Sequence, residues 1–376
     1  MAQADARLIR RGAAPLVLWL GLLGLPAVAT AQGPRLTVPP GFAIDVFSAA
    51  VGSPRFMALD PAGTLLVSEP ARGRVLALPD KDGDGKADSM QIVVDGLNQP
   101  HGLAFRDGQL YVAEMGRVVR FHYDPATMKA SQGRVLVPNL PAPDGHWTRT
   151  VVFGPDGRMY VSVGSSCNVC RENDRRRAAV LRYSADGGGE QIFSSGLRNA
   201  VGLAFHPTTG VLWATVNERD WRGDDVPPDY VTEIREGTFH GWPDCMVVGG
   251  KVVVDTRFAT GARCAGVTPP VVEIQAHSAP IGLTFYTGTQ FPEEYRGSLF
   301  AAFRGSWNRS VPTGYKIVRI PFRDGRPAGP PEDFATGWLD GTQAWGRPVD
   351  LIVGRDGALY LSTQDAGRVY RISHRS

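Results

Sequence analysis

The sequence lacks any concentration of charge of one sign. Its 376 residues carry 40 basic and 37 acidic side chains, and the two signs almost cancel once residues 1–31 are set aside. It contains no tract or stripe of Lys and Arg, which is the electrostatic feature on which nucleic-acid binding depends. We therefore expect no nucleic-acid partner.

Long apolar runs are also missing outside the first residues. Only the stretch from Ala13 to Leu25 is apolar enough to consider, and at about 13 residues it is shorter than the roughly 20 that a spanning helix needs. It follows Arg10-Arg11 and precedes Ala29-Thr-Ala31, a small-x-small cleavage sequence. We interpret residues 1–31 as a secretory signal peptide; the alternative is a membrane anchor. This interpretation predicts cleavage near Ala31, a periplasmic or secreted protein, and no membrane span in the mature chain.

Long uninterrupted helices are excluded by the 45 glycines and 29 prolines. These residues break helices repeatedly and suit short strands that are joined by tight turns. Six segments share one pattern, in which an apolar strand, a Gly-containing turn and a second strand are often followed by a Gly-Arg-Val strand. The segments begin at Pro54, Pro100, Arg149, Asn199, Pro280 and Pro348.

This repeat predicts an all-β fold, a six-bladed β-propeller that forms a single domain over residues 32–376. The first four segments are spaced by about 46–51 residues, which is close to the length of a four-stranded blade. The last repeat ends the chain without a fourth strand, and the alternating run from Phe42 to Phe47 has no partner of its own. We expect this N-terminal strand to pair with the last blade and close the ring, which removes exposed sheet edges.

Only four cysteines are present, and an oxidising compartment favours disulfides over free thiols. Cys245 and Cys264 flank a stretch in which Gly249-Gly250 stands between two valine-rich runs. That pattern predicts a hairpin that brings its ends, and so the two cysteines, together.

The other two cysteines form the motif Cys167-Asn-Val-Cys170. It fits a disulfide that staples a loop, a redox pair, or half of a zinc site that lacks a second pair of ligands nearby. A haem attachment would need His where Arg171 stands. Because no Cys-x-x-Cys-His occurs in the chain, electrons from a redox reaction would have to leave to a separate acceptor, a cytochrome or a quinone.

Loops at one end of a propeller channel carry function, because the strands supply a rigid frame. Polar side chains stand just ahead of the first strands of the repeats, and we expect them to converge on one channel mouth. They are Gln99, His101, His146, Arg149, Arg198, Asn199, His277 and Arg347. Neutral imidazole can accept a proton, and guanidinium groups pair bidentately with carboxylates.

Four motifs follow one another on this repeat: Gly145–Gly157, Gly196–Pro207, Asn217–Asp229 and Gly241-Trp-Pro243. In this order they resemble the soluble pyrroloquinoline quinone (PQQ)-dependent sugar dehydrogenases, the glucose/sorbosone dehydrogenase family, and especially its sorbosone-type branch. The resemblance spans nearly all of the chain after residue 31. It implies a periplasmic quinoprotein oxidoreductase that oxidises an aldose or aldosulose by hydride transfer to PQQ, with a small sugar as substrate.

The resemblance also implies a general base. His146 stands eight residues before the Gly154-Pro-Asp156 turn, as the family's base does. Oxidation of a sugar hydroxyl needs a group that takes the O–H proton while hydride leaves. Family members carry an Asp directly before the base; here that position is Gly145, and Asp144 lies one residue further back.

The family's cofactor contacts can be carried over in the same way. Arg198 and Asn199 match an Arg-Asn pair whose Arg lies near the quinone, which gives Arg198 a catalytic role as well. Arg304 stands where the family has Lys, and Arg347 matches the first of two arginines, of which the second is Val349 here. With Gln99 at the same channel end, the expected cofactor-binding residues are Gln99, Arg198, Asn199, Arg304 and Arg347. Calcium is implied at the cofactor through the backbone carbonyls of Glu218 and Arg219.

A second cation site is suggested by an acidic loop. Asp80, Asp82, Asp84 and Asp88 have a spacing that can wrap a hard cation, with Gly85 at the sharp turn. The twelfth position of such a loop is Gln91 instead of Glu. A structural calcium loop and a solvated hairpin tip both remain open.

A second class of function also remains open. It is a propeller without a quinone, acting as a calcium-dependent hydrolase or lactonase, or as a carbohydrate-binding protein. A lactonase-like propeller would place Glu and Asn side chains around an axial calcium, whereas this chain has Arg and His at those loop starts. Trp147, Trp221 and Trp307 could stack on a sugar or pack in the core.

Overall fold

Short strands and tight turns dominate the chain, as its glycine and proline content predicts. The computed structural model describes residues 35–258 and 261–375, so the predicted signal peptide lies outside the described residues. Within these ranges there is no α-helix, and the short 3-10 helices are η1 (Pro70–Arg72), η2 (Gly261–Cys264) and η3 (Glu293–Tyr295). None of the described helices has the length and hydropathy to cross a bilayer.

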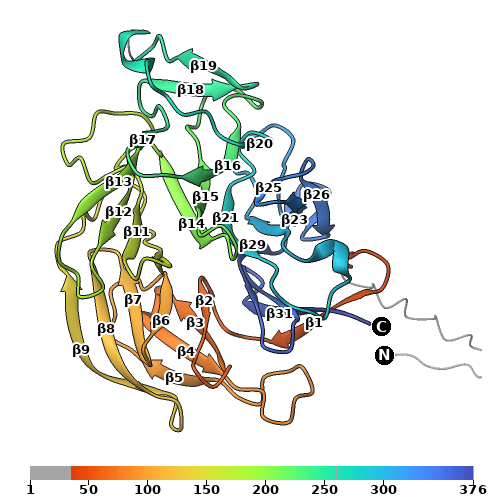
Figure 1. The fold of residues 1–376 in the computed structure, drawn as a ribbon. Coiled ribbons are helices and arrows are strands. Elements are labelled where there is room, and N and C mark those ends of the chain that lie inside the picture. Colours follow the sequence, from red (N-terminus) through yellow and green to blue (C-terminus); the bar gives the residue numbers. More distant parts are fainter. Residues whose placement is uncertain (1–34, 259–260, 376) are drawn as a thin grey trace, which may run out of the picture. The chain divides into compact units, whose positions relative to one another are not determined.

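Six mainly antiparallel sheets are arranged around a central axis, which confirms the predicted six-bladed β-propeller (Figure 1). The first blade is β2 (Met57–Leu59), β3 (Leu65–Glu69), β4 (Arg74–Leu78) and β5 (Gln91–Val94), and the second is β6 (Leu103–Arg106), β7 (Gln109–Glu114), β8 (Arg117–Asp124) and β9 (Lys129–Val137). The third is β10 (Val151–Phe153), β11 (Met159–Val163), β12 (Ala179–Tyr183) and β13 (Gln191–Ser195), extended in parallel by β17 (Thr238–Phe239).

The other three blades follow the same order from the axis outward. The fourth is β14 (Asn199–Phe205), β15 (Leu212–Asn217), β16 (Asp229–Ile234) and β20 (Val272–Ile274), and the fifth is β21 (Pro280–Phe285), β22 (Leu299–Phe303), β23 (Lys316–Ile320) and β26 (Glu332–Ala335). The sixth is β29 (Arg347–Val353), β30 (Leu359–Gln364), β31 (Arg368–His374) and β1 (Phe42–Ser48). Each innermost strand contacts the innermost strand of the next blade, and β29 contacts β2.

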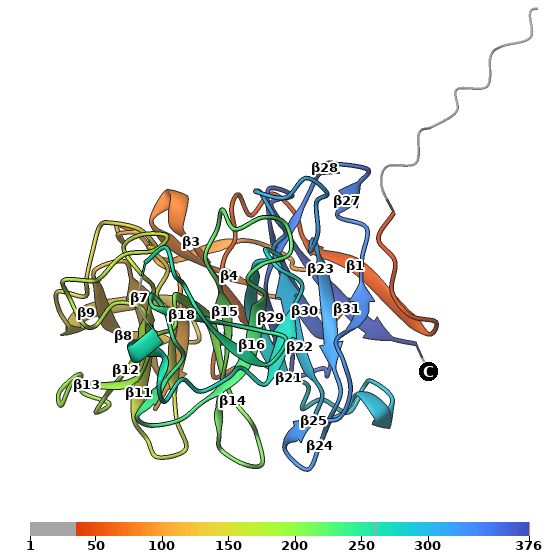
Figure 2. The same ribbon diagram turned by 90° about the horizontal axis from the view of Figure 1, so that it is seen from above.

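Three hairpins lie outside the blades. They are β18 (Cys245–Val248) with β19 (Lys251–Val254), β24 (Phe322–Arg323) with β25 (Arg326–Pro327), and β27 (Leu339–Asp340) with β28 (Gln343–Ala344). Figure 2 shows the β24–β25 and β27–β28 hairpins on opposite sides of the propeller.

The N-terminal strand has the partner that the sequence predicts. β1 pairs antiparallel with β31, with Phe42 opposite His374. The Phe42 ring packs edge-on against Phe291 and Phe334 of the fifth-blade region, at centroid distances of 4.7 and 5.1 Å. That this pairing closes the ring remains a prediction.

Hydrogen bonds between blades add to the packing. The Ser68 hydroxyl of β3 donates to the His101 carbonyl ahead of the second blade at 2.7 Å. In the same way, Ser362 Oγ of β30 donates to the Arg55 carbonyl ahead of the first blade at 2.6 Å. Buried polar groups that are satisfied in this way fix one arrangement of neighbouring blades.

Apolar side chains fill the wedges between blades and plug the axis. One cluster joins Leu66 of the first blade to Leu110 of the second, and similar clusters lie between the other neighbours. A separate cluster on the axis consists of Phe56, Val201, Ile281 and Val349. The inner strands therefore enclose a small apolar plug.

Both cysteine pairs form disulfides. Cys245 and Cys264 are bonded, as predicted, and the hairpin between them turns at Gly249-Gly250, where both residues have positive φ. Cys167 and Cys170 are also bonded, which fits a loop staple or the oxidised form of a redox pair and disfavours the zinc alternative.

Replacing Cys245 and Cys264 together with Ser is expected to lower the free energy of unfolding by about 3 kcal/mol, because the disulfide closes a loop of intermediate length in the unfolded chain. Urea unfolding followed by circular dichroism measures this loss. A matched variant with Ser at Cys167 and Cys170 opens a much shorter loop and should lose less. An unchanged free energy of unfolding in the first variant would contradict the prediction.

Candidate active site

A polar cavity lies next to the axial plug. Its volume is about 350 Å³, and Val201 and Ile281 of the plug form part of its wall. The charged and polar side chains that line it come from loops ahead of, or after, inner strands of several blades. They are Arg55, His146, Arg198, Asn199, Asn217, Glu218, Asp220, Asp229, His277, Arg304, Asn308 and Gln364.

The cavity brings together six of the charged and polar residues singled out from the sequence, namely His146, Arg198, Asn199, Glu218, His277 and Arg304. Gln99 is exposed and lines a smaller neighbouring pocket, which shares Arg55, Trp147 and Gln364 with the wall of the cavity.

Besides Gln99, four residues singled out from the sequence for this site do not line the cavity, namely His101, Arg149, Arg219 and Arg347. Arg347 Nε donates to Asp365 Oδ2 at 3.0 Å, and its guanidinium lies 5.1 Å from the centre of the Tyr315 ring. The Arg219 side chain is fully buried and forms ion pairs with Glu218 and Asp255 at 3.0 and 2.9 Å. The guanidinium groups of Arg347 and Arg219 therefore have partners within the protein.

The His146 ring is held in one tautomer. Its Nδ1 lies 3.0 Å from the Ser165 carbonyl oxygen and 3.0 Å from Ser165 Oγ. The Ser165 hydroxyl donates its hydrogen to the Cys167 carbonyl at 2.7 Å. Both Ser165 oxygens must therefore accept a hydrogen bond from His146 Nδ1. Nδ1 must then carry the hydrogen, which leaves the lone pair on Nε2.

The electrostatic surroundings keep this imidazole neutral. Burial, and after it the nearby Arg198 charge, lower the pKa of His146 to about 3. A lowered pKa means that the protonated form is disfavoured, so the ring stays neutral over the whole physiological range. A neutral ring with a free Nε2 lone pair can accept a proton from a bound hydroxyl group.

The residue before His146 cannot be Asp in this chain. Gly145 has φ +70°, and a Cβ placed on it would lie 2.4 Å from the Ser165 carbonyl oxygen. The Asp144 side chain is exposed. The backbone carbonyl of Asp144 accepts a hydrogen bond from Arg177 Nη1 at 2.7 Å. Ser165, and not a carboxylate, therefore bonds to His146 Nδ1 in this chain.

The chain segment that contains Ser165 also holds the Arg198 side chain in place. Its Nε donates to the Asn168 carbonyl at 3.1 Å and one Nη donates to Asn168 Oδ1 at 3.0 Å and to Asp220 Oδ2 at 2.8 Å. The other Nη donates to the carbonyls of Glu218 and Asn217 at 2.6 and 3.4 Å. All five N–H groups of this guanidinium thus have partners within the protein.

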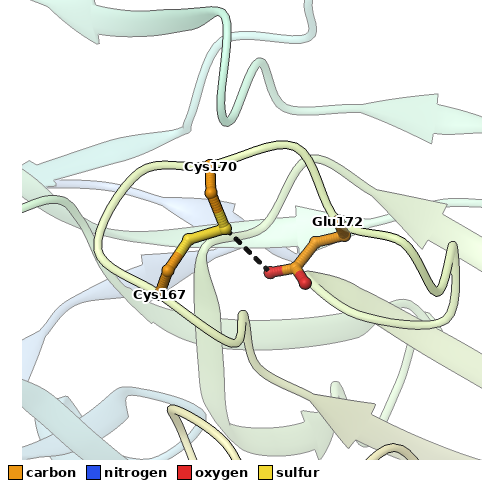
Figure 3. Close-up of side chains that lie close together, drawn as sticks. All are labelled: Cys167, Cys170 and Glu172. Atoms are coloured by element: carbon orange, nitrogen blue, oxygen red, sulfur yellow. Dashed lines mark hydrogen bonds between the residues drawn. A yellow bond between two sulfur atoms is a disulfide. The ribbon is translucent and has the colours of Figure 1, made fainter.

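A disulfide closes the segment that makes these contacts. Figure 3 shows the Cys167–Cys170 bond with the Glu172 carboxylate beside it, and Cys170 Sγ lies 4.0 Å from Glu172 Oε1. Glu172 also accepts from the backbone N–H and the hydroxyl of Ser166, both at 2.7 Å. Oxidised sulfurs are poor metal ligands, so this group fits a loop staple and does not fit a zinc site.

Arg55 is a cavity residue that the sequence interpretation missed. It is 6% exposed, and its Nε has no hydrogen-bond partner among the described residues. Gln364 Oε1 accepts from Arg55 Nη1 at 3.0 Å and from Arg304 Nε at 3.1 Å, so one amide oxygen bridges two guanidinium groups. The available signal was position: Arg55 stands two residues before β2, as Arg149 stands two residues before β10.

The charges of Arg55 and Arg304 are opposed only in part by carboxylates in their surroundings, Asp350 and Asp365. Burial, and after it the like charge of Arg304, lower the pKa of Arg55 to about 9. Among the described residues, no carboxylate forms an ion pair with either side chain. A buried and a half-buried cation that share a neutral acceptor make this part of the cavity suited to an anion.

Asn199 also lines the cavity, and Gly164 lies between Asn199 and His146. Asn199 Oδ1 is buried and has no hydrogen-bond partner among the described residues. A Cβ on Gly164 would lie 2.5 Å from this oxygen and 2.6 Å from the Cβ of His146. Only glycine therefore lets the chain pass between the two side chains.

At the expected calcium position, one neighbouring group opposes a cation and another could favour it. The Glu218 carbonyl already accepts from Arg198, whose positive charge opposes a cation beside it. The buried Asp229 carboxylate also lines the cavity; it accepts from the backbone N–H groups of Glu218 and Ala279 at 2.8 and 2.9 Å. Burial raises the pKa of Asp229 to about 7, so part of it is protonated at neutral pH.

The acidic loop lies away from this cavity. Asp80, Asp82 and Asp88 each place a carboxylate oxygen within 4.8 Å of the others, and Asp84 is outside this group. The Asp80 carboxylate accepts from the backbone N–H groups of Gly83 and Gly85 at 2.9 and 3.0 Å. Calcium binding by this loop remains a prediction.

Comparison with known proteins identifies the family. Residues 36–375 match the TrAA12-like family. The chain belongs to this family. It is similar to a PQQ-dependent pyranose dehydrogenase of Coprinopsis cinerea, with 28% identity over 412 residues, which covers 91% of this chain and 55% of the relative.

Two further comparisons give the same result for this TrAA12-like chain. A PQQ-dependent sugar dehydrogenase of Hypocrea jecorina is 26% identical over 418 residues, covering 91% of each chain. The holo form of the pyranose dehydrogenase PQQ domain from Coprinopsis cinerea superimposes with a TM-score of 0.79 at 24% identity, covering 91% of this chain and 98% of that chain. The family match and the two curated relatives confirm the resemblance to PQQ-dependent sugar dehydrogenases, and the structural match shows the same fold.

The tautomer and pKa of His146 can be measured directly. In the protein without added cofactor we expect a neutral ring with hydrogen on Nδ1 and no protonation as the pH falls from 8 to about 4, because the pKa of His146 is lowered to about 3. Nitrogen-15 NMR of the imidazole, assigned with the His146→Gln variant, reports both properties. A ring that titrates near pH 6.5, or that carries its hydrogen on Nε2, would show that this arrangement is wrong.

Proposed function

We propose that this TrAA12-like protein is a PQQ-dependent sugar dehydrogenase that oxidises an aldose or aldosulose of the glucose or sorbosone type. The observation that carries the proposal is the pair Arg55 and Arg304, two guanidinium groups joined by Gln364 with no carboxylate paired to either among the described residues. PQQ has three carboxylates, and charge-assisted bonds to guanidinium groups are the strong kind.

The residues of the cavity fit such a cofactor. Val201 and Ile281 offer an apolar surface to planar rings, while Arg55 Nε and Asn199 Oδ1 are buried polar atoms that lack partners. We propose Arg55 and Arg304 as the main carboxylate contacts, and Asn199 as a further polar contact. We still propose Arg198 as the cation near the quinone, although all of its N–H groups donate to acceptors of the protein.

The proposed chemistry removes one hydride and one proton from the sugar. Bound PQQ supplies the acceptor of the hydride. His146 Nε2 takes the hydroxyl proton, and the Nδ1 hydrogen bond to Ser165 stabilises the ring as it becomes positively charged. The sugar leaves as a lactone, or as an acid when a hydrated aldehyde reacts. The imidazolium then returns its proton to solvent.

Electrons are proposed to pass to a separate acceptor, a cytochrome or a quinone, because the sequence has no Cys-x-x-Cys-His. A periplasmic or secreted location, after cleavage near Ala31, is proposed from the leader sequence. The two disulfides support it, because disulfides persist in oxidising compartments. Calcium at the Glu218 and Arg219 carbonyls, contacts from Gln99 and Arg347, and calcium in the acidic loop are also proposed from the sequence.

PQQ binding should depend on Arg55 and Arg304, the two cavity arginines without an ion-pair partner among the described residues. At PQQ concentrations of about 100 times the dissociation constant, we expect stabilisation of the wild type by about 2.7 kcal/mol. Arg55→Gln and Arg304→Gln should each weaken PQQ binding by roughly 10-fold or more, because a charge-assisted contact is worth about 1.5–3 kcal/mol. Thermal unfolding with and without PQQ measures the effect.

Arg323→Gln is the control for those variants, because Arg323 is exposed and outside the cavity. It should bind PQQ as the wild type does. No thermal stabilisation and no change in the PQQ absorption spectrum with the wild type would overturn the proposed function and favour a hydrolase or a carbohydrate-binding protein.

The base assignment predicts a separation of binding from turnover. His146→Ala should retain PQQ binding but lose about 100-fold to 10,000-fold in kcat, because a general base acts on the substrate proton and contributes little to binding a tri-anion. Arg198→Ala should weaken cofactor binding as well as turnover, because it removes a cation from the cavity wall. Binding and steady-state assays with glucose measure both. Near wild-type turnover in His146→Ala would rule out this base.

A further inference from the structure

Two tryptophans are exposed at the edge of the cavity. The Trp221 side chain is 66% exposed and that of Trp307 is 61% exposed. Their ring centroids are 5.1 Å apart, and their planes are nearly perpendicular at 87°. Trp307 lines the cavity, whereas Trp221 lies beyond its lining residues. The pair therefore extends outward from the place where the proposed substrate binds.

The two loops that carry these rings are bonded to each other. Asn308 Nδ2 donates to Asp220 Oδ1 at 2.8 Å, and the Ser310 backbone N–H donates to Asp224 Oδ1 at 3.1 Å. The residue before Trp221 also accepts from Arg198, so the Trp221 loop is fixed to the cavity wall. These contacts hold the two loops that carry the rings against each other.

The backbone at Trp221 is unusual for a large residue. Its φ is +66°, in the left-handed region that bulky side chains rarely adopt. Strain of this kind persists where the surroundings impose it, and it is concentrated at functional sites. Holding an indole in this conformation, with two thirds of its surface in water, gives no packing benefit that would explain it.

The chemistry of the pair selects one kind of occupant. Indole faces stack on the C–H face of a sugar ring, and a rigid aromatic loses little conformational entropy on binding. Val311 is the one further large exposed apolar residue on these two loops, among the residues that the structure describes. Three side chains are far too few for a stable protein interface, which buries roughly 800 Å² per partner.

We propose that Trp221 and Trp307 form a binding site for a second sugar ring, adjacent to the one that is oxidised. The substrate class is then oligosaccharides or the ends of polysaccharide chains, with monosaccharides as minimal substrates. This inference rests on the proposed function, because the oxidised ring must lie in the cavity for the second ring to reach Trp221.

The test compares glucose with cellobiose, cellotriose, maltose and maltotriose as substrates of the PQQ-loaded protein. In one of the two linkage series, kcat/KM should rise by about 2-fold to 10-fold from glucose to the disaccharide through a lower KM, which corresponds to an aromatic contact of about 0.5–1.5 kcal/mol. Trp221→Ala should reduce that ratio to about 1, and Trp221→Phe should restore part of it. Val311→Ala, on the facing loop, is the control and should keep the wild-type ratio.

Binding without turnover gives a second readout. Oligosaccharides should quench the tryptophan fluorescence of the protein without added PQQ, and Trp221→Ala should bind them more weakly. A protein that binds PQQ and oxidises glucose but gains nothing from a second ring in either series would disprove this binding site and leave the proposed function intact. Oligosaccharide binding at Trp221 without sugar oxidation would contradict the proposed function and support a carbohydrate-binding protein.

Discussion

The hydrogen bonds made by residues 165–168 are the constraint on which the candidate site depends. Ser165 accepts at His146 Nδ1 and donates its backbone N–H to the Arg198 carbonyl at 2.8 Å, while Asn168 accepts from the Arg198 guanidinium. One short segment therefore sets both the tautomer of the imidazole and the direction of the guanidinium. The Cys167–Cys170 disulfide closes that segment, which links the oxidised state of the protein to the geometry of the site.

Charge balance gives the cavity its chemical character. Arg198 in the cavity wall is neutralised by Asp220, and the buried Arg219 behind it by Glu218 and Asp255. Arg55 and Arg304 have no such ion-pair partner among the described residues, and partial or full burial makes their charge costly. A ligand with several carboxylates removes that cost. The folded protein is thus arranged for a polyanion, while the apolar plug beneath suits planar rings.

Much of the fold could be predicted from the sequence because its repeat is regular. Each blade begins with a short apolar strand after Pro, Arg or Asn, and the partner of the N-terminal strand followed from the missing fourth strand of the last blade. The positions of His146, Arg198, Asn199 and Arg304 at the cavity followed from the same reasoning together with the family resemblance.

Other features depend on contacts that the sequence does not display. The alignment of Arg347 with a family arginine could not reveal that Asp365 pairs with it, eighteen residues along the chain. Arg55 was missed because nothing in its own segment distinguishes it from a surface arginine until Gln364 is placed beside it. The orienting role of Ser165 depends on the close passage of Gly145, which is a property of packing.

The most direct measurement is a crystal structure of the protein with PQQ at saturating concentration. We expect one PQQ in the cavity, with its carboxylates bonded to Arg55 and Arg304 and with the His146 ring in the orientation that Ser165 imposes. A cofactor that leaves both arginines without contact, or that binds elsewhere on the propeller, would contradict the account.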